Sequence, residues 1–74
     1  MKLKKFRMIM NEAVIFAKNL IQMQIYTTAE VEELVKDLLA MKGIHTSNRK
    51  DLMNIITRGA ILLNEEPERI LLAV

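Results

Sequence analysis

The spacing of apolar and polar residues changes along this chain, and the changes mark out its expected elements. Residues 20–26 contain a stretch, Ile21–Tyr26, in which apolar and polar side chains alternate, as in a strand with one buried face. Apolar residues then recur at helical spacing over Ala29–Lys42 and over Asn48–Leu63. Because a single strand cannot satisfy its own backbone hydrogen-bonding groups, the pattern predicts that this strand pairs with the strand of a second copy.

The segment that follows, residues 28–42, has the features of a well-defined helix. Thr27 and Glu30 have the spacing of a capping box, and acidic residues in the first turns suit the positive end of the helix dipole. Glu32 and Lys36, four residues apart, are expected to form an ion pair on the solvent face. The side chains expected on the buried face are Val31, Leu34, Val35, Leu38 and Met41.

A glycine and a short polar connection separate this helix from the next one, which is predicted over residues 48–64. Gly43 can end the first helix in the left-handed conformation, and either Ser47 or Asn48 can cap the second. Glycine costs a helix about 1 kcal/mol relative to alanine, so Gly59 inside the second helix indicates a close helix–helix crossing. The other residues of its apolar stripe are Leu52, Ile55, Ile56, Leu62 and Leu63.

Two further helical segments are expected outside this core. Residues 8–19 are an apolar stretch that Asn11 can cap, and we expect it to form an extra helix packed on the body of the protein. Residues 66–73 are predicted to form a short C-terminal helix with Pro67 in its first turn. The chain is therefore expected to be a single domain that is mainly α-helical with one short β-strand.

Positive charge is concentrated at the start of the chain. Residues 1–7 form a basic arm without an acidic residue, while the formal net charge of the whole chain is only +2. A basic arm on a nearly neutral body suits contact with phosphate groups. Arg49 and Lys50 lie in the first turn of a predicted helix, where the dipole disfavours cations, and a bound anion would relieve that conflict.

The composition narrows the class of protein. The chain has only 74 residues but is 51% hydrophobic, which is more apolar surface than a small monomer hides easily, so an oligomer is predicted. It has no cysteine and one histidine, His45, and no Gly-rich phosphate loop or Ser–His–Asp set. We therefore expect no enzyme, metal site, cofactor or small-molecule substrate. No apolar run reaches the ~18 residues of a membrane span, so we expect a cytoplasmic protein that does not act at a membrane.

Several of these features occur in a particular order. They are the alternating strand, the capped acidic helix with Glu30-Val31 and Leu34-Val35-Lys36, then Gly43, and a helix that opens at Ser47–Leu52. In this order they resemble the ribbon-helix-helix repressors of the Arc and MetJ class, over Ile21 to about Leu63. The resemblance implies an intertwined homodimer whose two-stranded antiparallel ribbon enters the major groove of double-stranded DNA. It implies a small transcriptional regulator that binds a specific DNA sequence.

The same resemblance assigns roles to individual residues. It implies that the outward strand residues Gln22, Gln24 and Tyr26 read bases, and a glutamine amide can form two hydrogen bonds to adenine. It also implies that the start of the last core helix grips phosphate. The expected phosphate contacts are Ser47, Asn48, Arg49 and Lys50, with Lys4, Lys5 and Arg7 of the basic arm.

Two alternatives remain open at this point. Residues 5–10 also alternate, so the ribbon can instead present Lys5, Arg7 and Ile9, with Asn11 capping the helix that follows. The competing class is an all-helical protein-interaction module or inhibitor that docks an apolar helix face on a partner. In that class Ile21–Tyr26 continues the helix begun at Asn11.

Overall fold

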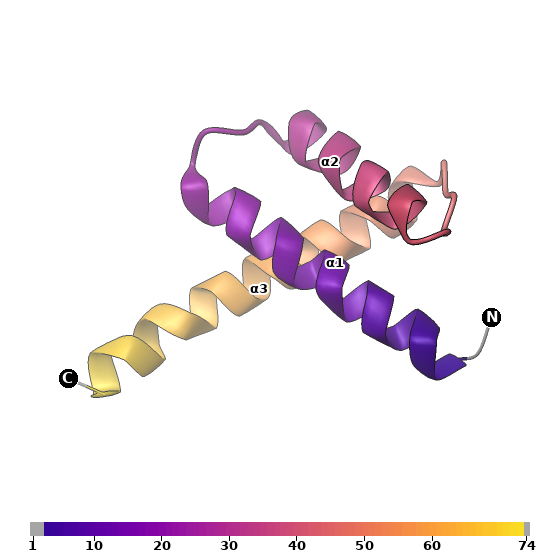
Figure 1. Cartoon of the computed structure of the whole chain (residues 1–74). Coiled ribbons are helices and arrows are strands. Elements are labelled where there is room, and N and C mark those ends of the chain that lie inside the picture. Colours follow the sequence, from indigo (N-terminus) through magenta and orange to yellow (C-terminus); the bar gives the residue numbers. More distant parts are fainter. Residues whose placement is uncertain (1–2, 74) are drawn as a thin grey trace.

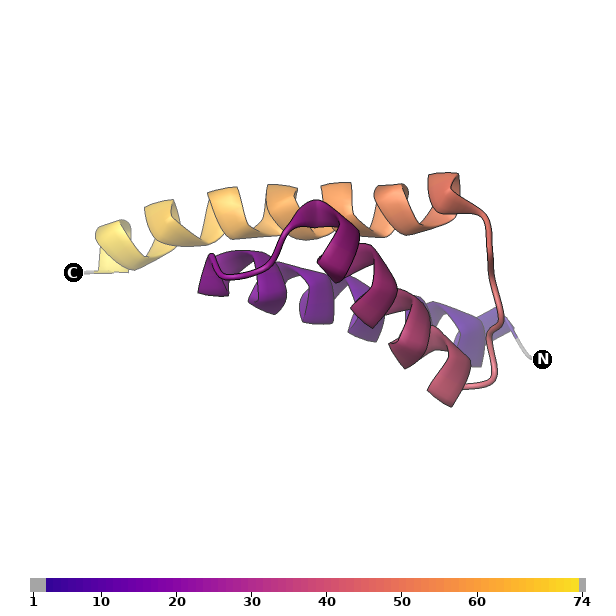
Figure 2. The same ribbon diagram turned by 90° about the horizontal axis from the view of Figure 1, so that it is seen from above.

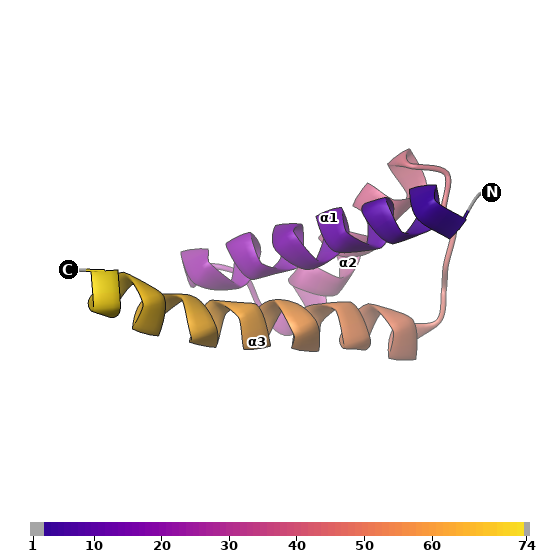
Figure 3. The ribbon, with the colours of Figure 1, turned by 90° about the horizontal axis from the view of Figure 1, so that it is seen from below.

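The described part of the chain folds as three α-helices. The computed structural model describes the backbone of residues 3–73 and the side chains of residues 4–65. The helices are α1 (Leu3–Met23), α2 (Thr28–Met41) and α3 (Arg49–Ala73). α1 and α3 cross while running in the same general direction, and α2 returns in the opposite direction (Figure 1). Seen from above and from below, the C-terminal part of α3 extends beyond the end of α1 (Figure 2 and Figure 3).

The predicted strand at residues 20–26 is wrong. Ile21–Met23 form the last turn of α1, and residues 24–27 connect α1 to α2. The alternating pattern does not correspond to a buried face, because Met23 and Ile25 are 54% and 67% exposed. In the helical turn of Ile21–Met23 the backbone N–H groups donate to carbonyls of the same helix, so they need no partner strand.

The alternative ribbon at residues 5–10 is also wrong, because these residues lie inside α1. Residues 3–7, expected as a basic arm, are the first turns of the same helix, and residues 1–2 lie outside the described part. No strand is present in residues 3–73. The ribbon-helix-helix architecture and the homodimer intertwined through a β-ribbon are therefore corrected to an all-α fold.

α1 is helical because its apolar residues recur at every third or fourth position, which places them on one face. The buried residues of this face are Ile9, Ala13, Val14, Ala17 and Leu20. The face packs against both other helices, and the core lies where the three meet. The largest fully buried side chains of that core are Val35 and Leu39 from α2 and Ile55 from α3.

The N-terminus of α2 is fixed by the predicted capping box. The Glu30 N–H donates to the Thr27 hydroxyl over 3.2 Å, and the Thr27 N–H donates to the Glu30 carboxylate over 2.9 Å. The bond from the backbone N–H of Thr27, with a smaller contribution from its side chain, lowers the pKa of Glu30 below its usual 4.5. Both hydrogen bonds satisfy donors that a helix start leaves without an intrahelical partner.

α2 ends at Met41, and Gly43 just after it adopts the left-handed conformation predicted from the sequence. Gly43 has a φ of +88°, and its N–H donates to the carbonyl of Ala40 over 3.0 Å. The N–H of Ile44 donates to the carbonyl of Leu39 over 2.8 Å, which completes a Schellman motif. The motif turns Ile44 back so that it packs partly buried against the core.

The buried face of α2 is rotated from the predicted one. Its buried apolar residues are Val31, Val35 and Leu39, with Leu34 and Leu38 partly buried beside them. Met41, expected on this face, is 83% exposed. Glu32, expected in solvent beside Lys36, is only 8% exposed. The sequence pattern therefore predicted the helix correctly but not which side of it is buried.

α3 begins at the cap formed by Asn48, one of the two predicted candidates. The Asn48 side-chain oxygen accepts a hydrogen bond from the Lys50 N–H over 2.9 Å. From there α3 is continuous to Ala73, where the sequence predicts two helices over residues 48–64 and 66–73. They are one helix because no described residue between them adopts the left-handed conformation that ends α2.

Gly59 confirms the predicted close crossing. A Cβ atom placed on Gly59 would lie 2.9 Å from the backbone nitrogen of Lys18 and 3.1 Å from the carbonyl oxygen of Val14. It would also lie 3.2 Å from the Cβ of Ala17. The backbone of α3 therefore approaches α1 to a distance that only glycine allows at this position.

Candidate protein-interaction surface

The residues predicted to read bases lie in and beside the connection between α1 and α2. Gln22 is exposed in the last turn of α1, and Tyr26 is 37% exposed in the connection. Gln24 has a φ of 58°, and its N–H donates to the carbonyl of Ile21 over 3.1 Å. The three side chains therefore do not share the outward face of a strand.

The predicted phosphate contacts lie toward the other end of the molecule. Lys4, Lys5 and Arg7 are exposed on the first turns of α1, and residues 47–50 are exposed at the start of α3. The starts of α1 and α3 lie at the same end of the molecule, away from the α1–α2 connection (Figure 1). At about 1.5 Å per residue, α1 separates Arg7 from Gln22 by roughly 22 Å. The structure thus separates the basic residues from the predicted base-reading residues.

One of the predicted phosphate contacts already faces an anion of the chain itself. The Arg49 guanidinium nitrogen Nη2 lies 3.5 Å from Glu32 Oε2 of α2. The Arg49 side chain is 81% exposed, whereas the Glu32 side chain is 11% exposed. Glu32 Oε1 is buried and has no hydrogen-bond partner among the described residues. The cation at the start of α3 therefore has a partner in Glu32, which sequence reasoning placed in solvent.

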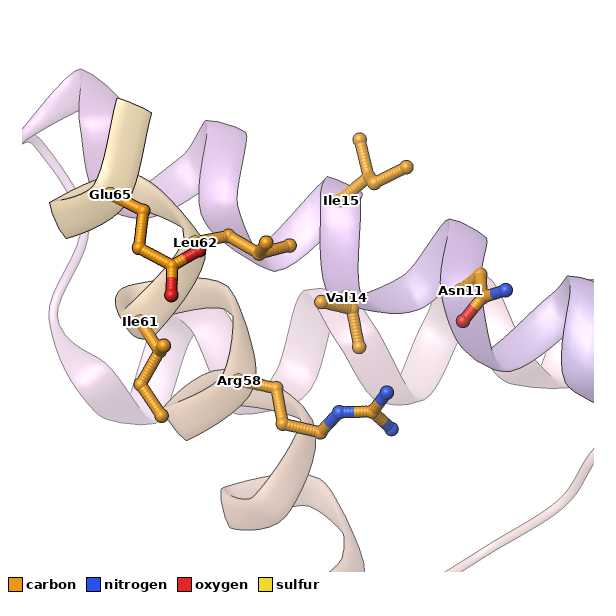
Figure 4. Close-up of a pocket in the computed structure, with 7 residues that line it drawn as sticks. All are labelled: Asn11, Val14, Ile15, Arg58, Ile61, Leu62 and Glu65. Carbon is orange, nitrogen blue, oxygen red and sulfur yellow. The ribbon is translucent and has the colours of Figure 1, made fainter. Parts of the chain in front are cut away.

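An apolar hollow lies between α1 and α3, beside their crossing. Its cavity volume is about 470 Å³, and its lining is Asn11, Val14 and Ile15 of α1 with Arg58, Ile61, Leu62 and Glu65 of α3. We call this set of seven residues the α1–α3 groove. Arg58 and Leu62 extend from α3 toward α1, whereas Ile61 points away from α1 (Figure 4). Ile15, Ile61 and Leu62 are 50%, 52% and 36% exposed, so the groove presents large aliphatic side chains to solvent.

Charged residues lie on both sides of the aliphatic part of the groove. Arg58 and Glu65 are exposed, and neither forms an ion pair with another residue of the described part. Arg58 also lines the adjoining hollow with Arg7 and Asn11 of α1. One end of the groove is therefore basic and the other acidic.

Sequence reasoning did not single out this groove. It assigned Leu62 to the core-facing stripe of its helix, and it gave no role to Arg58, Ile61 or Glu65. The spacing of the four residues, at positions i, i+3, i+4 and i+7, places them on one side of a helix and was visible in the sequence. Their exposure depends on which side of α3 packs on α1, and that is a property of the fold.

Two other kinds of site are absent from the part of the chain that the structure describes. Its residues include no group of three or more His, Cys, Asp or Glu side chains placed to hold a metal ion. None of its helices is long and apolar enough to cross a membrane.

Comparisons with protein families, with curated proteins and with solved structures find no match to this chain.

Proposed function

We propose that this chain is a small helical protein-interaction module that binds an apolar helix of a partner in the α1–α3 groove. The proposal rests mainly on Ile15, Ile61 and Leu62, which expose a third or more of their surface on one side of a helix pair. Exposed apolar surface that is collected in one groove and flanked by charges is typical of protein-binding sites.

The shape and chemistry of the groove support a helical occupant. Its aliphatic residues come from two helices that cross, so a third helix can pack its apolar side chains between them. Burying such side chains contributes about 25 cal/mol for each Å² of apolar surface removed from water. Arg58 and Glu65 at the two ends favour one orientation of the occupant through charge complementarity.

A photo-cross-linking experiment tests the proposal. Ile61 is replaced by benzoylphenylalanine, and the protein is irradiated in the cells that naturally produce it. Met41 provides the matched control, because it is also apolar and exposed but lies at the end of α2. We expect one defined product from position 61, identified by mass spectrometry, and none from position 41. We also expect Ile15→Asp, on the α1 side of the groove, to remove that product.

The opposite results would contradict the proposal. Position 61 would then give no product, or the same products as position 41, or a product that Ile15→Asp leaves unchanged. Circular dichroism of the Ile15→Asp variant serves as the folding control. Because Ile15 is half exposed, we expect its fold to be retained.

A second candidate function, contact with the DNA backbone, is supported by a different observation. Lys4, Lys5 and Arg7 are all exposed on the first turns of α1, and Arg7 lies beside Arg58 in one hollow. Clustered cations of this kind attract phosphate and release counterions when they bind. Such binding would not use a β-ribbon, because residues 3–73 contain no strand.

A further inference from the structure

We infer that the occupant of the α1–α3 groove is a second copy of the same chain, with the two α3 helices packed antiparallel about a two-fold axis. This inference rests on the proposed function and names its partner. The proposed interface is formed by α3 helices and does not involve paired strands.

The spacing of the four α3 residues in the groove is symmetric. Arg58, Ile61, Leu62 and Glu65 are separated by three, one and three positions, and the same spacing is read in the reverse direction. When two such helices pack antiparallel with the axis between positions 61 and 62, Ile61 of each chain meets Leu62 of the other. A two-fold interface brings the same patch of both copies together, so a patch must complement itself in this way.

The two ends of this symmetric spacing carry opposite charges, Arg58 at one end and Glu65 at the other. The antiparallel arrangement places Arg58 of each chain next to Glu65 of the other, which gives two ion pairs. A parallel arrangement would instead place arginine beside arginine and glutamate beside glutamate, which is repulsive. Neither Arg58 nor Glu65 has an ion-pair partner among the described residues of its own chain, so both are available for the second copy.

The apolar content of the chain supports this occupant. More than half of its residues are hydrophobic, and Ile15, Ile61 and Leu62 remain partly exposed in the described structure. A chain of 74 residues buries a smaller share of its surface than a larger domain, so pairing of its apolar faces adds core that one copy lacks. Ile15 of α1 borders the same groove and would be covered by the second α3.

Charge reversal provides the first test. The wild-type protein should sediment at twice the 8.6 kDa mass of one chain at micromolar concentration. Arg58→Glu and Glu65→Arg should each raise the dimer dissociation constant about tenfold, which corresponds to about 1.4 kcal/mol. The double variant, in which both charges are exchanged, should recover an affinity close to that of the wild type. Lys36→Glu, on the exposed side of α2, is the control and should leave the dimer unchanged.

Cysteine cross-linking provides the second test. The chain contains no cysteine, so a single introduced thiol reports on one position only. Ile61→Cys lies next to the proposed axis and should be joined into covalent dimers by a short bismaleimide. Met41→Cys, also exposed but on α2, should stay monomeric under the same conditions.

The outcomes separate this inference from the proposed function. A wild-type monomer that still gives a product with another protein from position 61 would overturn the second copy but retain the interaction module. The wild type could be a dimer while the double variant does not recover its affinity, or while Ile61→Cys gives no covalent dimer. Either result would overturn the antiparallel α3 pairing. A monomer that gives no cross-linked product at all would contradict both.

Discussion

At the scale of single residues, Gly59 determines how closely the two long helices approach each other. Its position on α3 faces the backbone of α1 between Val14 and Lys18, with Ala17 as the facing side chain. The absence of a side chain on α3 and the small methyl group on α1 allow this contact. Leu52, Ile55 and Ile56 of α3 are buried against the remaining core.

We predict that Gly59→Ala destabilises the fold. Alanine would raise the helix propensity of α3 by about 1 kcal/mol. Its Cβ, however, would lie 2.9 Å from a backbone nitrogen of α1, so that α1 and α3 must move apart. Because overpacking of this kind costs about 1–3 kcal/mol, we expect a net decrease in the free energy of unfolding. Urea denaturation followed by circular dichroism measures it, and an increase in stability would show that the two helices cross less closely.

At the scale of elements, the rotation of α2 decides which leucine supports the core. Leu39 is 1% exposed, whereas Leu38 is only partly buried. The sequence pattern places Leu38 in the middle of the buried face and leaves Leu39 outside it. The two leucines are adjacent and chemically identical, so substitutions at these positions compare the two orientations of the helix.

We predict that Leu39→Ala lowers the free energy of unfolding by about 2–5 kcal/mol, because it removes a fully buried side chain and leaves a cavity. Leu38→Ala should cost clearly less. Met41→Ala, at a position that is 83% exposed, should change stability by less than about 0.5 kcal/mol. Thermal and urea unfolding of the three variants gives the order. A larger loss of stability at Leu38 than at Leu39 would contradict this orientation of α2.

The cap of α2 gives a prediction that depends on pH. Thr27→Ala removes the hydroxyl that accepts from the Glu30 N–H and should cost about 1 kcal/mol at neutral pH. The pKa of Glu30 should rise part of the way toward 4.5, since the stronger hydrogen bond from the backbone N–H of residue 27 remains. NMR titration of the Glu30 carboxyl carbon measures this pKa, and an unchanged value would show that the Thr27 side chain does not contribute to lowering it.

The direction of the pH effect follows from the lowered pKa. In the wild type, the ionised form of Glu30 is more stable in the folded state than in the unfolded state. This contribution to stability is present above about pH 4.5 and is lost as the pH falls through the folded-state pKa. The contribution should be smaller in Thr27→Ala. Stability curves of both proteins below neutral pH compare the two.

The elements that the sequence predicted correctly depend on contacts between residues close together in the chain. The cap at Thr27 and Glu30, the stop at Gly43 and the cap at Asn48 are local hydrogen-bonding arrangements, so their residue types and spacing suffice. The alternation in Ile21–Tyr26 was misleading because it does not reflect burial. Its apolar residues fit a strand face, but they also fit the exposed end of a helix and a connection.

The candidate site could not be predicted from any short segment of the sequence. The spacing of Arg58, Ile61, Leu62 and Glu65 could be read from the sequence. Which side of α3 stays exposed is decided by its crossing with α1 at Gly59, and the groove needs Ile15 from far along the chain. The burial of Glu32 likewise follows from how α2 faces the other helices and not from the adjacent residues in sequence.

At the scale of the whole molecule, the structure places two surfaces on different parts of the protein. The α1–α3 groove lies beside the helix crossing, and the basic residues Lys4 and Lys5 lie at the start of α1. Arg7 and Arg58 line a common hollow between these two regions. A partner that covers the groove would therefore lie close to Arg7, so protein binding and phosphate binding are expected to influence each other where both occur.

The distance between Gln22 and the basic start of α1 leads to the last prediction, which concerns DNA. If the protein binds duplex DNA, changing Lys4, Lys5 and Arg7 to alanine should weaken binding to every sequence. The slope of log affinity against log salt should fall by about 0.9 for each phosphate group that the variant no longer neutralises. Changing Gln22 and Gln24 to alanine should leave both affinity and salt slope unchanged, because these residues lie at and just beyond the other end of α1.

Fluorescence anisotropy with a random duplex at two salt concentrations measures both effects, and circular dichroism confirms that each variant is folded. All five altered side chains are exposed, so we expect the helices to remain intact. A wild-type protein that does not bind duplex DNA would remove the second candidate function and leave the α1–α3 groove as the functional surface. A loss of binding on changing the two glutamines, with the basic residues intact, would show instead that DNA contacts the α1–α2 connection. If the basic variant lost binding as well, one bound duplex would have to span the roughly 22 Å between Arg7 and Gln22, because both ends of α1 would then contribute to the same site.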